Sequence, residues 1–124
     1  MKSVALIDDD PVFITKLSRL VKRYTEFCIV ADTRSGREGI LAIEHFRPDL
    51  IIMDIMMPEN DGLTVLQYIR KKCGEYNPFI YVITAMETPV IQAILEDYKV
   101  DFVSFKPIEN KDEITDILKC IIMK

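Results

Sequence analysis

The sequence predicts an α/β protein built on a doubly wound, mostly parallel β-sheet with helices on both faces. Short runs of β-forming residues alternate with amphipathic helical patterns along the whole chain. Several of these runs are apolar at consecutive positions, as strands covered on both faces must be. The length of 124 residues suits one domain. Strict alternation within one domain implies right-handed crossovers and therefore parallel strands.

The predicted strands are short and lack a helical period. The run at 50–53 is apolar throughout, which indicates a strand with no solvent-facing side. Turn-forming and polar residues separate the runs at short, regular intervals. The strands are expected at Ser3–Ile7, Phe27–Asp32, Leu50–Met53, Phe79–Ile83 and Phe102–Phe105.

Five helical patterns follow these strands, and most open on a recognisable start signal. The signals are Asp10-Pro11 for the first, Ser35 with Glu38 in capping-box spacing for the second, Thr88-Pro89 for the fourth and Asn110 with Glu113 for the fifth. The apolar faces comprise Phe13, Leu17, Leu20 and Tyr24; Ile40 and Ile43; Val65, Leu66, Ile69 and Cys73; Ile91, Ile94, Leu95 and Tyr98; and Ile114, Ile117, Leu118 and Ile121. The favoured architecture is a flavodoxin-like doubly wound fold of five parallel strands, in order 2-1-3-4-5, with five helices.

The composition excludes several classes of protein. The 16 basic and 20 acidic residues give a net charge of −4, which argues against a nucleic-acid partner because phosphate neutralisation needs a basic field. No apolar run approaches the length of a membrane span. The N-terminus reaches Asp8 too soon to be a secretory signal. We therefore expect a cytosolic location and no membrane contact.

Cysteine and histidine supply no predicted metal site. Cys28, Cys73 and Cys120 are odd in number and match no zinc or redox spacing, which indicates reduced and mostly buried thiols. The one histidine, His45, lies far along the chain from the other candidate site residues. We interpret it as a surface or helix-terminal residue.

Polar residues that could bind a ligand or take part in a reaction follow four of the predicted strands. They are Asp8, Asp9 and Asp10 after the first strand, Asp54 after the third, Thr84 after the fourth and Lys106-Pro107 after the fifth. Each has an ordinary structural explanation when it is taken alone, such as turn chemistry or a helix cap. Together they belong to one edge of the sheet, because the functional crevice of such folds lies outside the carboxyl ends of the strands.

The carboxylates of Asp8, Asp9 and Asp54 would crowd one small crevice. Like charges that close raise at least one carboxyl pKa unless a cation intervenes. Hard oxygen ligands without paired histidine or cysteine select Mg²⁺ over zinc. Acidic groups, a metal and a lysine at one place suit phosphoryl transfer, which needs a nucleophile, a metal and donors for the phosphoryl oxygens. Asp54 is the candidate nucleophile and would form an aspartyl phosphate.

The sequence resembles the receiver domain of two-component response regulators over essentially its whole length, 1–124. The resemblance rests on four motifs in the right order. They are Leu6-Ile7-Asp8-Asp9-Asp10-Pro11, Met53-Asp54-Ile55-Met56-Met57-Pro58 followed by Asp61-Gly62, Ile83-Thr84-Ala85, and Lys106-Pro107. Any one of these motifs alone would be weak, whereas the ordered set is specific.

The resemblance implies a role for each matching residue. These are Asp54 as phospho-acceptor, Asp8 and Asp9 as the acidic pair, the Met56 backbone carbonyl as a further Mg²⁺ ligand, and the Thr84 hydroxyl and Lys106 as phosphoryl-binding groups. It also implies a cis peptide at Lys106-Pro107, a phosphohistidine donor on a sensor histidine kinase or histidine phosphotransfer protein, and readout at the face of the fourth helix, fifth strand and fifth helix. Such a protein is a signalling switch rather than a turnover enzyme, and it can dimerise on phosphorylation.

One departure from the family pattern concerns the conformational switch. The family usually has a Phe or Tyr three residues before the lysine, where this chain has Val103. Phe102 and Phe105 flank that position and are expected on opposite sheet faces, because side chains alternate along a strand. Thr84, Phe102 and Val103 are therefore the switch candidates.

Two other functions stay open at the level of sequence. A small Mg²⁺-dependent phosphohydrolase would carry its nucleophilic aspartate on the first strand with another aspartate two positions on, which Asp8 and Asp10 could mimic. A degenerate receiver would act only as a docking module. Substitution of Asp54 separates the phospho-acceptor from the hydrolase, which would keep its first-strand nucleophile.

Overall fold

The alternating pattern folds into a single five-stranded sheet in a computed structural model that describes residues 1–72 and 74–124. The strands are β1 (Lys2–Ile7), β2 (Phe27–Thr33), β3 (Leu50–Met53), β4 (Phe79–Thr84) and β5 (Phe102–Phe105). Every pairing between neighbouring strands is parallel. The strand order β2-β1-β3-β4-β5 confirms the predicted doubly wound topology.

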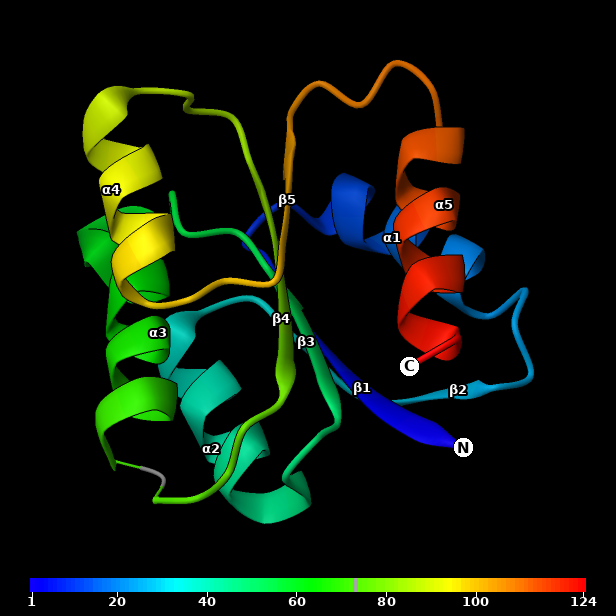
Figure 1. The fold of residues 1–124 in the computed structure, drawn as a ribbon, viewed down its shortest axis with the longest axis horizontal. Helices are drawn as coiled ribbons and strands as arrows, with labels where there is room; N and C mark the ends of the chain where they lie inside the picture. Colours follow the sequence, from blue (N-terminus) through cyan, green and yellow to red (C-terminus); the bar gives the residue numbers. More distant parts are fainter. Residues whose placement is uncertain (73) are drawn as a thin grey trace.

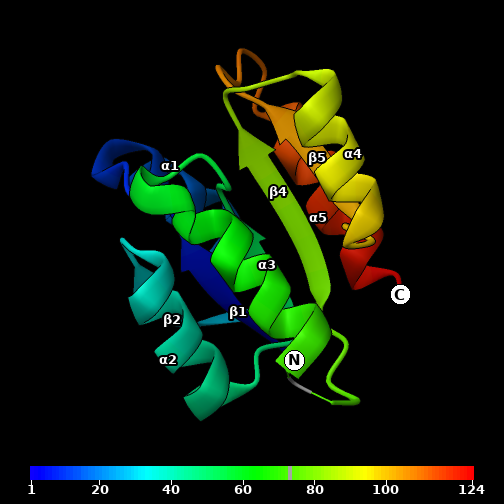
Figure 2. The same ribbon diagram turned by 90° about the vertical axis from the view of Figure 1, so that its left-hand side faces the viewer.

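Helices cover both faces of this sheet, as Figures 1 and 2 show. They are α1 (Pro11–Val21), α2 (Gly36–Phe46), α3 (Asp61–Lys72), α4 (Pro89–Asp97) and α5 (Asp112–Ile122), with a short 3₁₀ turn, η1 (Pro58–Asn60), before α3. α1 and α5 lie on one face, and α2, α3 and α4 lie on the other. No helix in the described part of the chain has the length and apolarity to cross a membrane.

Two apolar layers form the core, one on each side of the sheet. Consecutive strand residues enter opposite layers: Leu6 packs with the α1 and α5 side chains, whereas Ile7 packs with those of α2, α3 and α4. Ile51 and Ile52 on the central strand β3 divide in the same way, and both are buried. The consecutive apolar positions of the sequence therefore reflect a sheet covered on both faces.

Three of the predicted helix start signals are confirmed by their hydrogen bonds. The Asp10 side chain accepts from the backbone N–H groups of the first turn of α1. Ser35 Oγ accepts from the N–H of Glu38, and Thr88 Oγ1 accepts from the N–H of Ile91, at 3.2 Å each. These side chains satisfy donors that the helices cannot bond internally.

Two details of the predicted helices are wrong. Tyr24 lies beyond the end of α1 at Val21, although it still packs against the core on that side. Asn110 caps α5 without the predicted partner, because its Oδ1 accepts from the N–H of Asp112 at 2.9 Å and no side chain caps the helix from Lys111. The chain makes a turn before this helix begins, so the capping-box register is lost.

The prediction of mostly buried cysteines is also wrong. Cys28 and Cys120 are exposed. Cys28 lies on β2, which is an edge strand, and Cys120 lies on α5 outside its apolar stripe. Cys73, predicted on the inner face of the third helix, lies outside the described residues.

Arg70 ties the end of α3 to the turn between α4 and β5. Its guanidinium donates to the carbonyl oxygens of Tyr98 at 2.8 Å and Lys99 at 2.9 Å, and to Asn77 Oδ1 at 2.6 Å. Lys99 has a positive φ of 53°, which side-chain-bearing residues seldom adopt. The planar fork of an arginine can hold two adjacent carbonyls at once, so the C-terminal end of α4 is fixed.

A close backbone approach positions the start of α3. A Cβ placed on Gly62 would lie 2.2 Å from the Ile55 Cα and 2.6 Å from the Asp54 carbonyl oxygen. These are backbone atoms, so no rotation of a side chain can relieve the contact. The missing side chain allows α3 to begin directly against the segment that presents Asp54.

Tyr81 carries a buried hydroxyl group between the last two strands. Its Oη lies 2.6 Å from Ser104 Oγ, and the ring is completely covered. Burial raises the pKa of Tyr81 to about 12; the hydrogen bond with Ser104 opposes the rise and the charge of Glu113 adds to it. The neutral phenol is therefore strongly preferred in the folded state.

We predict that Gly62→Ala lowers the free energy of unfolding by about 1–3 kcal/mol, because the new Cβ must displace backbone. Urea unfolding monitored by circular dichroism measures the change. Gln67→Ala, at an exposed position of the same helix, serves as control and should change the stability by less than about 0.5 kcal/mol. Native-like stability of Gly62→Ala would contradict the close approach.

A second prediction concerns alkaline pH. Because the folded-state pKa of Tyr81 lies above its unfolded value of 10.0, the unfolded chain loses its proton first, and stability falls as pH rises from 10 towards 12. Between pH 10 and 11 this loss amounts to roughly 1 kcal/mol. Tyr81→Phe should be less stable at neutral pH and should lack this component of the loss. Parallel stability curves for the two proteins would refute the assignment.

Candidate functional site

The strand ends place the candidate residues at one edge of the sheet. Asp8 and Asp54 come directly after β1 and β3, and the Asp54 N–H donates to the Ile7 carbonyl at 3.0 Å, which keeps the two segments in register. The N–H of Lys106 donates to the carbonyl of Thr84 at 2.8 Å, which joins the ends of β4 and β5 in the same way. The backbone ladder thus aligns all four strand ends.

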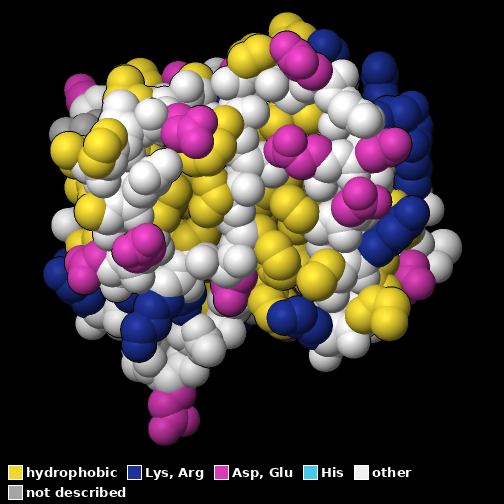
Figure 3. Space-filling view, turned by 45° about the horizontal axis from the view of Figure 1, so that its top comes forward, with side chains coloured by type: hydrophobic (Ala, Val, Ile, Leu, Met, Phe, Trp, Pro, Cys, Tyr) yellow, Lys and Arg dark blue, Asp and Glu magenta, His cyan; other side chains and the backbone are white. Residues whose placement is uncertain are grey.

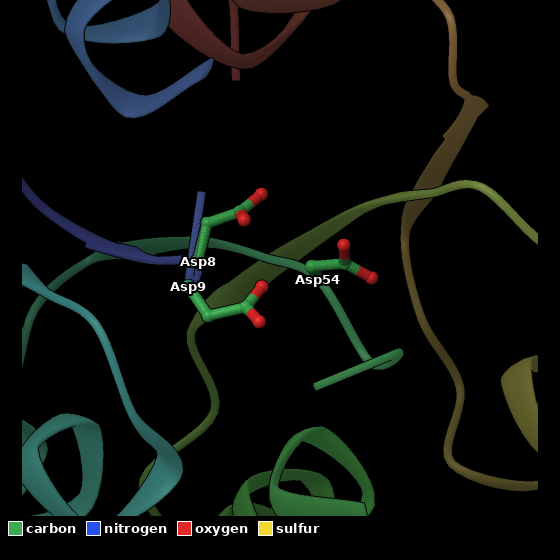
Figure 4. A group of neighbouring side chains, drawn as sticks. All are labelled: Asp8, Asp9 and Asp54. Carbon is green, nitrogen blue, oxygen red and sulfur yellow. The ribbon is translucent and has the colours of Figure 1, made fainter. Parts of the chain in front are cut away.

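Three carboxylates meet at this edge. Asp8, Asp9 and Asp54 each offer an oxygen, and these oxygens all lie within 4.8 Å of one another. Figure 4 shows the three carboxyl groups projecting in a common direction from the ends of β1 and β3. Asp8 and Asp54 are buried, whereas Asp9 is exposed. The cluster therefore combines two desolvated charges with one at the solvent boundary.

Lys106 bridges the two buried carboxylates. Its Nζ lies 2.8 Å from Asp8 Oδ2 and 3.0 Å from Asp54 Oδ2. Its side chain is only 16% exposed, and those of Asp8 and Asp54 are 4% and 6% exposed. Buried charges without a partner are costly, so this ammonium is what makes the burial of both carboxylates tolerable. The network still carries more negative than positive charge.

Backbone donors orient the remaining oxygens. The N–H of Asp10 donates to Asp8 Oδ1 at 2.9 Å, and the N–H of Met56 donates to Asp54 Oδ1 at 2.8 Å. Each buried carboxylate is therefore held at one oxygen by the backbone and at the other by Lys106. This fixes the direction of both groups without using a second cation.

The pKa directions reflect these opposing effects. Burial raises the pKa of the Asp8 carboxyl, and hydrogen bonds from Lys106 and the Asp10 N–H offset only part of that rise. Burial acts to lower the pKa of the Lys106 ammonium, but its hydrogen bonds with Asp8 and Asp54 outweigh burial and raise the pKa. Lys106 consequently stays charged, whereas the acidic side is short of positive charge.

Thr84 carries a buried hydroxyl that has no partner. Its Oγ1 is the one side-chain polar atom, among those of the described residues, that is fully covered and makes no hydrogen bond. Leaving such a group unsatisfied costs about 1–3 kcal/mol. An unpaired donor near a cluster of site residues indicates a position that an incoming acceptor can fill.

Phe13 is a site neighbour that the sequence pattern did not identify. The Lys106 Nζ lies 4.4 Å from the centroid of the Phe13 ring, which is a cation–π distance. The sequence placed Phe13 only on the apolar face of a helix. Its position in the first turn after the aspartates was the available signal, because that turn must start beside the strand end.

The switch candidates on β5 point to different layers. Phe102 packs with the α1 and α5 layer and makes an edge contact with Tyr81, with centroids 6.4 Å apart. Val103 packs with the layer of α3 and α4. The position that usually holds an aromatic residue in the family thus holds a short side chain on the α4 side.

The oxygen donors fit a hard divalent cation. The three carboxylates provide oxygens without any histidine or cysteine, which is the ligand chemistry that Mg²⁺ prefers. Asp9 has no ion-pair or hydrogen-bond partner among the described side chains, so its carboxylate is free to bind a cation. The net negative charge of the cluster favours the same conclusion.

Comparison with known proteins agrees with this geometry. The family model of the response regulator receiver domain matches residues 4–119. The chain belongs to this family. Receiver domains occur in response regulators of two-component systems, and the Lys106-Pro107 peptide, whose cis form the family resemblance implied, is cis in this structure.

The relatives of this receiver domain are larger proteins. A probable C4-dicarboxylate response regulator from Priestia megaterium is 34% identical over 82% of this chain and 44% of its own length. A protein-glutamate methylesterase/protein-glutamine glutaminase from Nitratidesulfovibrio vulgaris is 30% identical over 96% of this chain and 32% of its own length. The chain therefore spans less than half the length of these relatives.

Solved structures share the fold closely. The crystal structure of a DNA-binding response regulator of the LuxR family from Staphylococcus aureus has a TM-score of 0.86 and 27% identity, with 98% of this chain and 99% of that chain covered. The receiver domain of this chain thus has the architecture of a solved response regulator.

We predict that Asp9→Asn stabilises the metal-free receiver domain by about 1 kcal/mol, because it removes one of three clustered negative charges at a solvent-accessible position. Thermal or urea unfolding in the presence of a chelator measures the effect. Asp10→Asn is the matched control, since it removes the same charge from a helix cap that asparagine also serves. If Asp9→Asn and Asp10→Asn gave equal changes, crowding in the cluster would not be the cause.

Proposed function

We propose that this receiver domain is a phosphorelay switch that accepts a phosphoryl group on Asp54. The bridging of Asp8 and Asp54 by Lys106 is the observation that carries the proposal, because it places a positive charge beside an acceptor carboxylate and orients that carboxylate inside the fold. The nearby unpaired Thr84 hydroxyl supports it, since that donor suits a phosphoryl oxygen. Membership of the receiver-domain family also supports the proposal.

The transfer needs little covalent chemistry from the protein. An Asp54 oxygen attacks the phosphorus of a phosphohistidine, the N–P bond breaks, and its electron pair returns to the histidine nitrogen, which takes up a proton. Lys106 then pairs with a phosphoryl oxygen in place of the Asp54 oxygen that has become esterified. The Thr84 hydroxyl donates to another phosphoryl oxygen. Asp54 Oδ1 stays aligned by the Met56 N–H.

Mg²⁺ is part of this proposal. Asp9, assisted by Asp8, would hold the ion together with Asp54 and the Met56 backbone carbonyl. When bound, the ion supplies positive charge that neutralises phosphoryl oxygens. The three clustered carboxylates and the shortage of positive charge around them support the assignment.

The partners follow from the chemistry and from the family. The donor is a sensor histidine kinase or a histidine phosphotransfer protein, and we place the exchange in the cytosol as family membership implies. The output is a conformational change at the face of α4, β5 and α5. β5 is an edge strand flanked by these helices, so a change at its end can reach an outer surface.

The central test is labelling with acetyl phosphate and Mg²⁺ followed by intact mass. We expect the native chain to gain one phosphoryl group and Asp54→Asn to gain none, because the family pattern makes Asp54 the acceptor and Asp8 a metal ligand. Asp10→Asn serves as control and should label like the native chain. Labelling that persists in Asp54→Asn and disappears on substitution of Asp8 would favour the first-strand phosphohydrolase.

Phosphorylation is also expected to promote a homodimer through the face of α4, β5 and α5. Size-exclusion chromatography with light scattering, on labelled and unlabelled protein at several concentrations, measures it. We expect a larger apparent mass only for the labelled native chain, with Asp54→Asn unchanged. A constant monomer mass for fully labelled protein would contradict dimerisation while leaving the acceptor role intact.

A further inference from the structure

A cavity lies beside the acidic site, between α1, α5 and the loop that joins β5 to α5. Its volume is about 510 Å³. The buried side chains of Leu17, Leu20 and Ile114 line it, together with the partly exposed Phe13 and Ile108. Figure 3, which brings the upper edge forward, shows hydrophobic side chains exposed over this part of the molecule among charged ones. The cavity therefore has an apolar wall of ligand size.

The charged groups that line this cavity are mostly positive. Lys16 and Lys111 are exposed lining residues, and neither forms an ion pair within 1–72 or 74–124. Lys106 also lines the cavity. The one acidic lining residue, Asp10, uses its carboxylate to cap α1. Lys106 is already paired with Asp8 and Asp54, so in a chain with an overall net charge of −4 the ammonium groups of Lys16 and Lys111 are the ones that can bind an anion beside the apolar wall.

We propose that this cavity binds a small amphipathic anion, a hydrocarbon chain of medium length that ends in a carboxylate. The apolar wall suits the chain, and the two unpaired ammonium groups of Lys16 and Lys111 suit the head group. Charge complementarity excludes the cationic analogue of the same shape. A neutral hydrocarbon ligand would form no ionic contact with Lys16 or Lys111, so it would not account for the two lysines that line the cavity.

The cavity and the acidic site share a wall. The ring of Phe13 lines the cavity and lies under the Lys106 Nζ, which also holds Asp8 and Asp54. A hydrocarbon chain bound in the cavity packs against the Phe13 ring and so disturbs the contact between that ring and Lys106. The ligand is therefore expected to slow phosphorylation of Asp54, a consequence that rests on the proposed function, whereas binding itself does not.

Binding can be followed with an introduced tryptophan, because the chain contains none. Ile108→Trp places a fluorophore on the cavity wall, and Leu41→Trp places one at a 58% exposed position on α2 as the matched control. Decanoate should change the fluorescence of Ile108→Trp in a saturable way and leave Leu41→Trp unchanged. Octanoate should bind roughly tenfold more weakly, since two fewer CH₂ groups are buried.

The contribution of charge is tested in the same reporter. Lys16→Gln with Lys111→Gln should weaken decanoate binding by about fivefold or more, because two exposed ionic contacts are lost. Decyltrimethylammonium, with the same chain and a positive head, should not bind. Equal responses to the two head groups, or no response to decanoate, would overturn the proposal.

The tryptophan of Ile108→Trp could itself fill the cavity, so binding is also measured on the native chain by the change in amide NMR shifts when decanoate is added. Decanoate should shift signals of residues lining the cavity, such as Leu17, Leu20 and Ile114, and spare those of α2 and α3. Shifts spread evenly over the molecule would refute a specific site.

The coupling to Asp54 is measured last, as the rate of labelling by acetyl phosphate with and without decanoate. A slower rate is expected at saturating ligand, and an unchanged rate would refute the coupling. If the chain failed to label even without decanoate, the proposed function would be wrong, while the fluorescence result would still decide whether the cavity binds its ligand.

Discussion

The ammonium group of Lys106 is the constraint on which the site depends. Two carboxylates are buried at the carboxyl edge of the sheet, and Lys106 supplies the positive charge that offsets the cost of burying them. Asp8 comes from β1, Asp54 follows β3 and Lys106 follows β5, so one ion-pair network ties together three strand ends. Because Asp9 adds a further negative charge at the solvent boundary, the same network leaves the site receptive to a cation.

The fold supplies the precision that this network needs. Parallel strands end at the same edge, and consecutive apolar residues anchor each strand in both core layers. Gly62 lets α3 start against the segment that carries Asp54. Phe13 provides a ring beneath the ammonium and separates the acidic site from the neighbouring cavity. The contacts that hold the strand ends, α1 and α3 together at this edge are therefore also the ones that position the site residues.

Much of this arrangement could be predicted from the sequence, because periodicity reports which face of an element is apolar and topology determines where strands end. The meeting of Asp8, Asp54 and Lys106 follows from these two facts. The position of Phe13 in the first turn after the aspartates indicates only that it lies near the strand end, because its contact with Lys106 depends on how α1 tilts against the sheet. The exposure of Cys28 was missed although the predicted strand order places its strand at the sheet edge, because the pattern does not show which side chains of that edge strand a helix covers.

The hydrogen bonds of Arg70 have a consequence for how α4 can move. They fix the carbonyls of Tyr98 and Lys99, where the helix ends, whereas its first turn follows the loop that leaves Thr84. A rod held at one end can swing about that end but cannot slide along its length. The hydrogen bonds of Arg70 therefore resist movement at the C-terminal end of α4, and we expect a rearrangement of this helix to displace its first turn, next to the acidic site, more than its last.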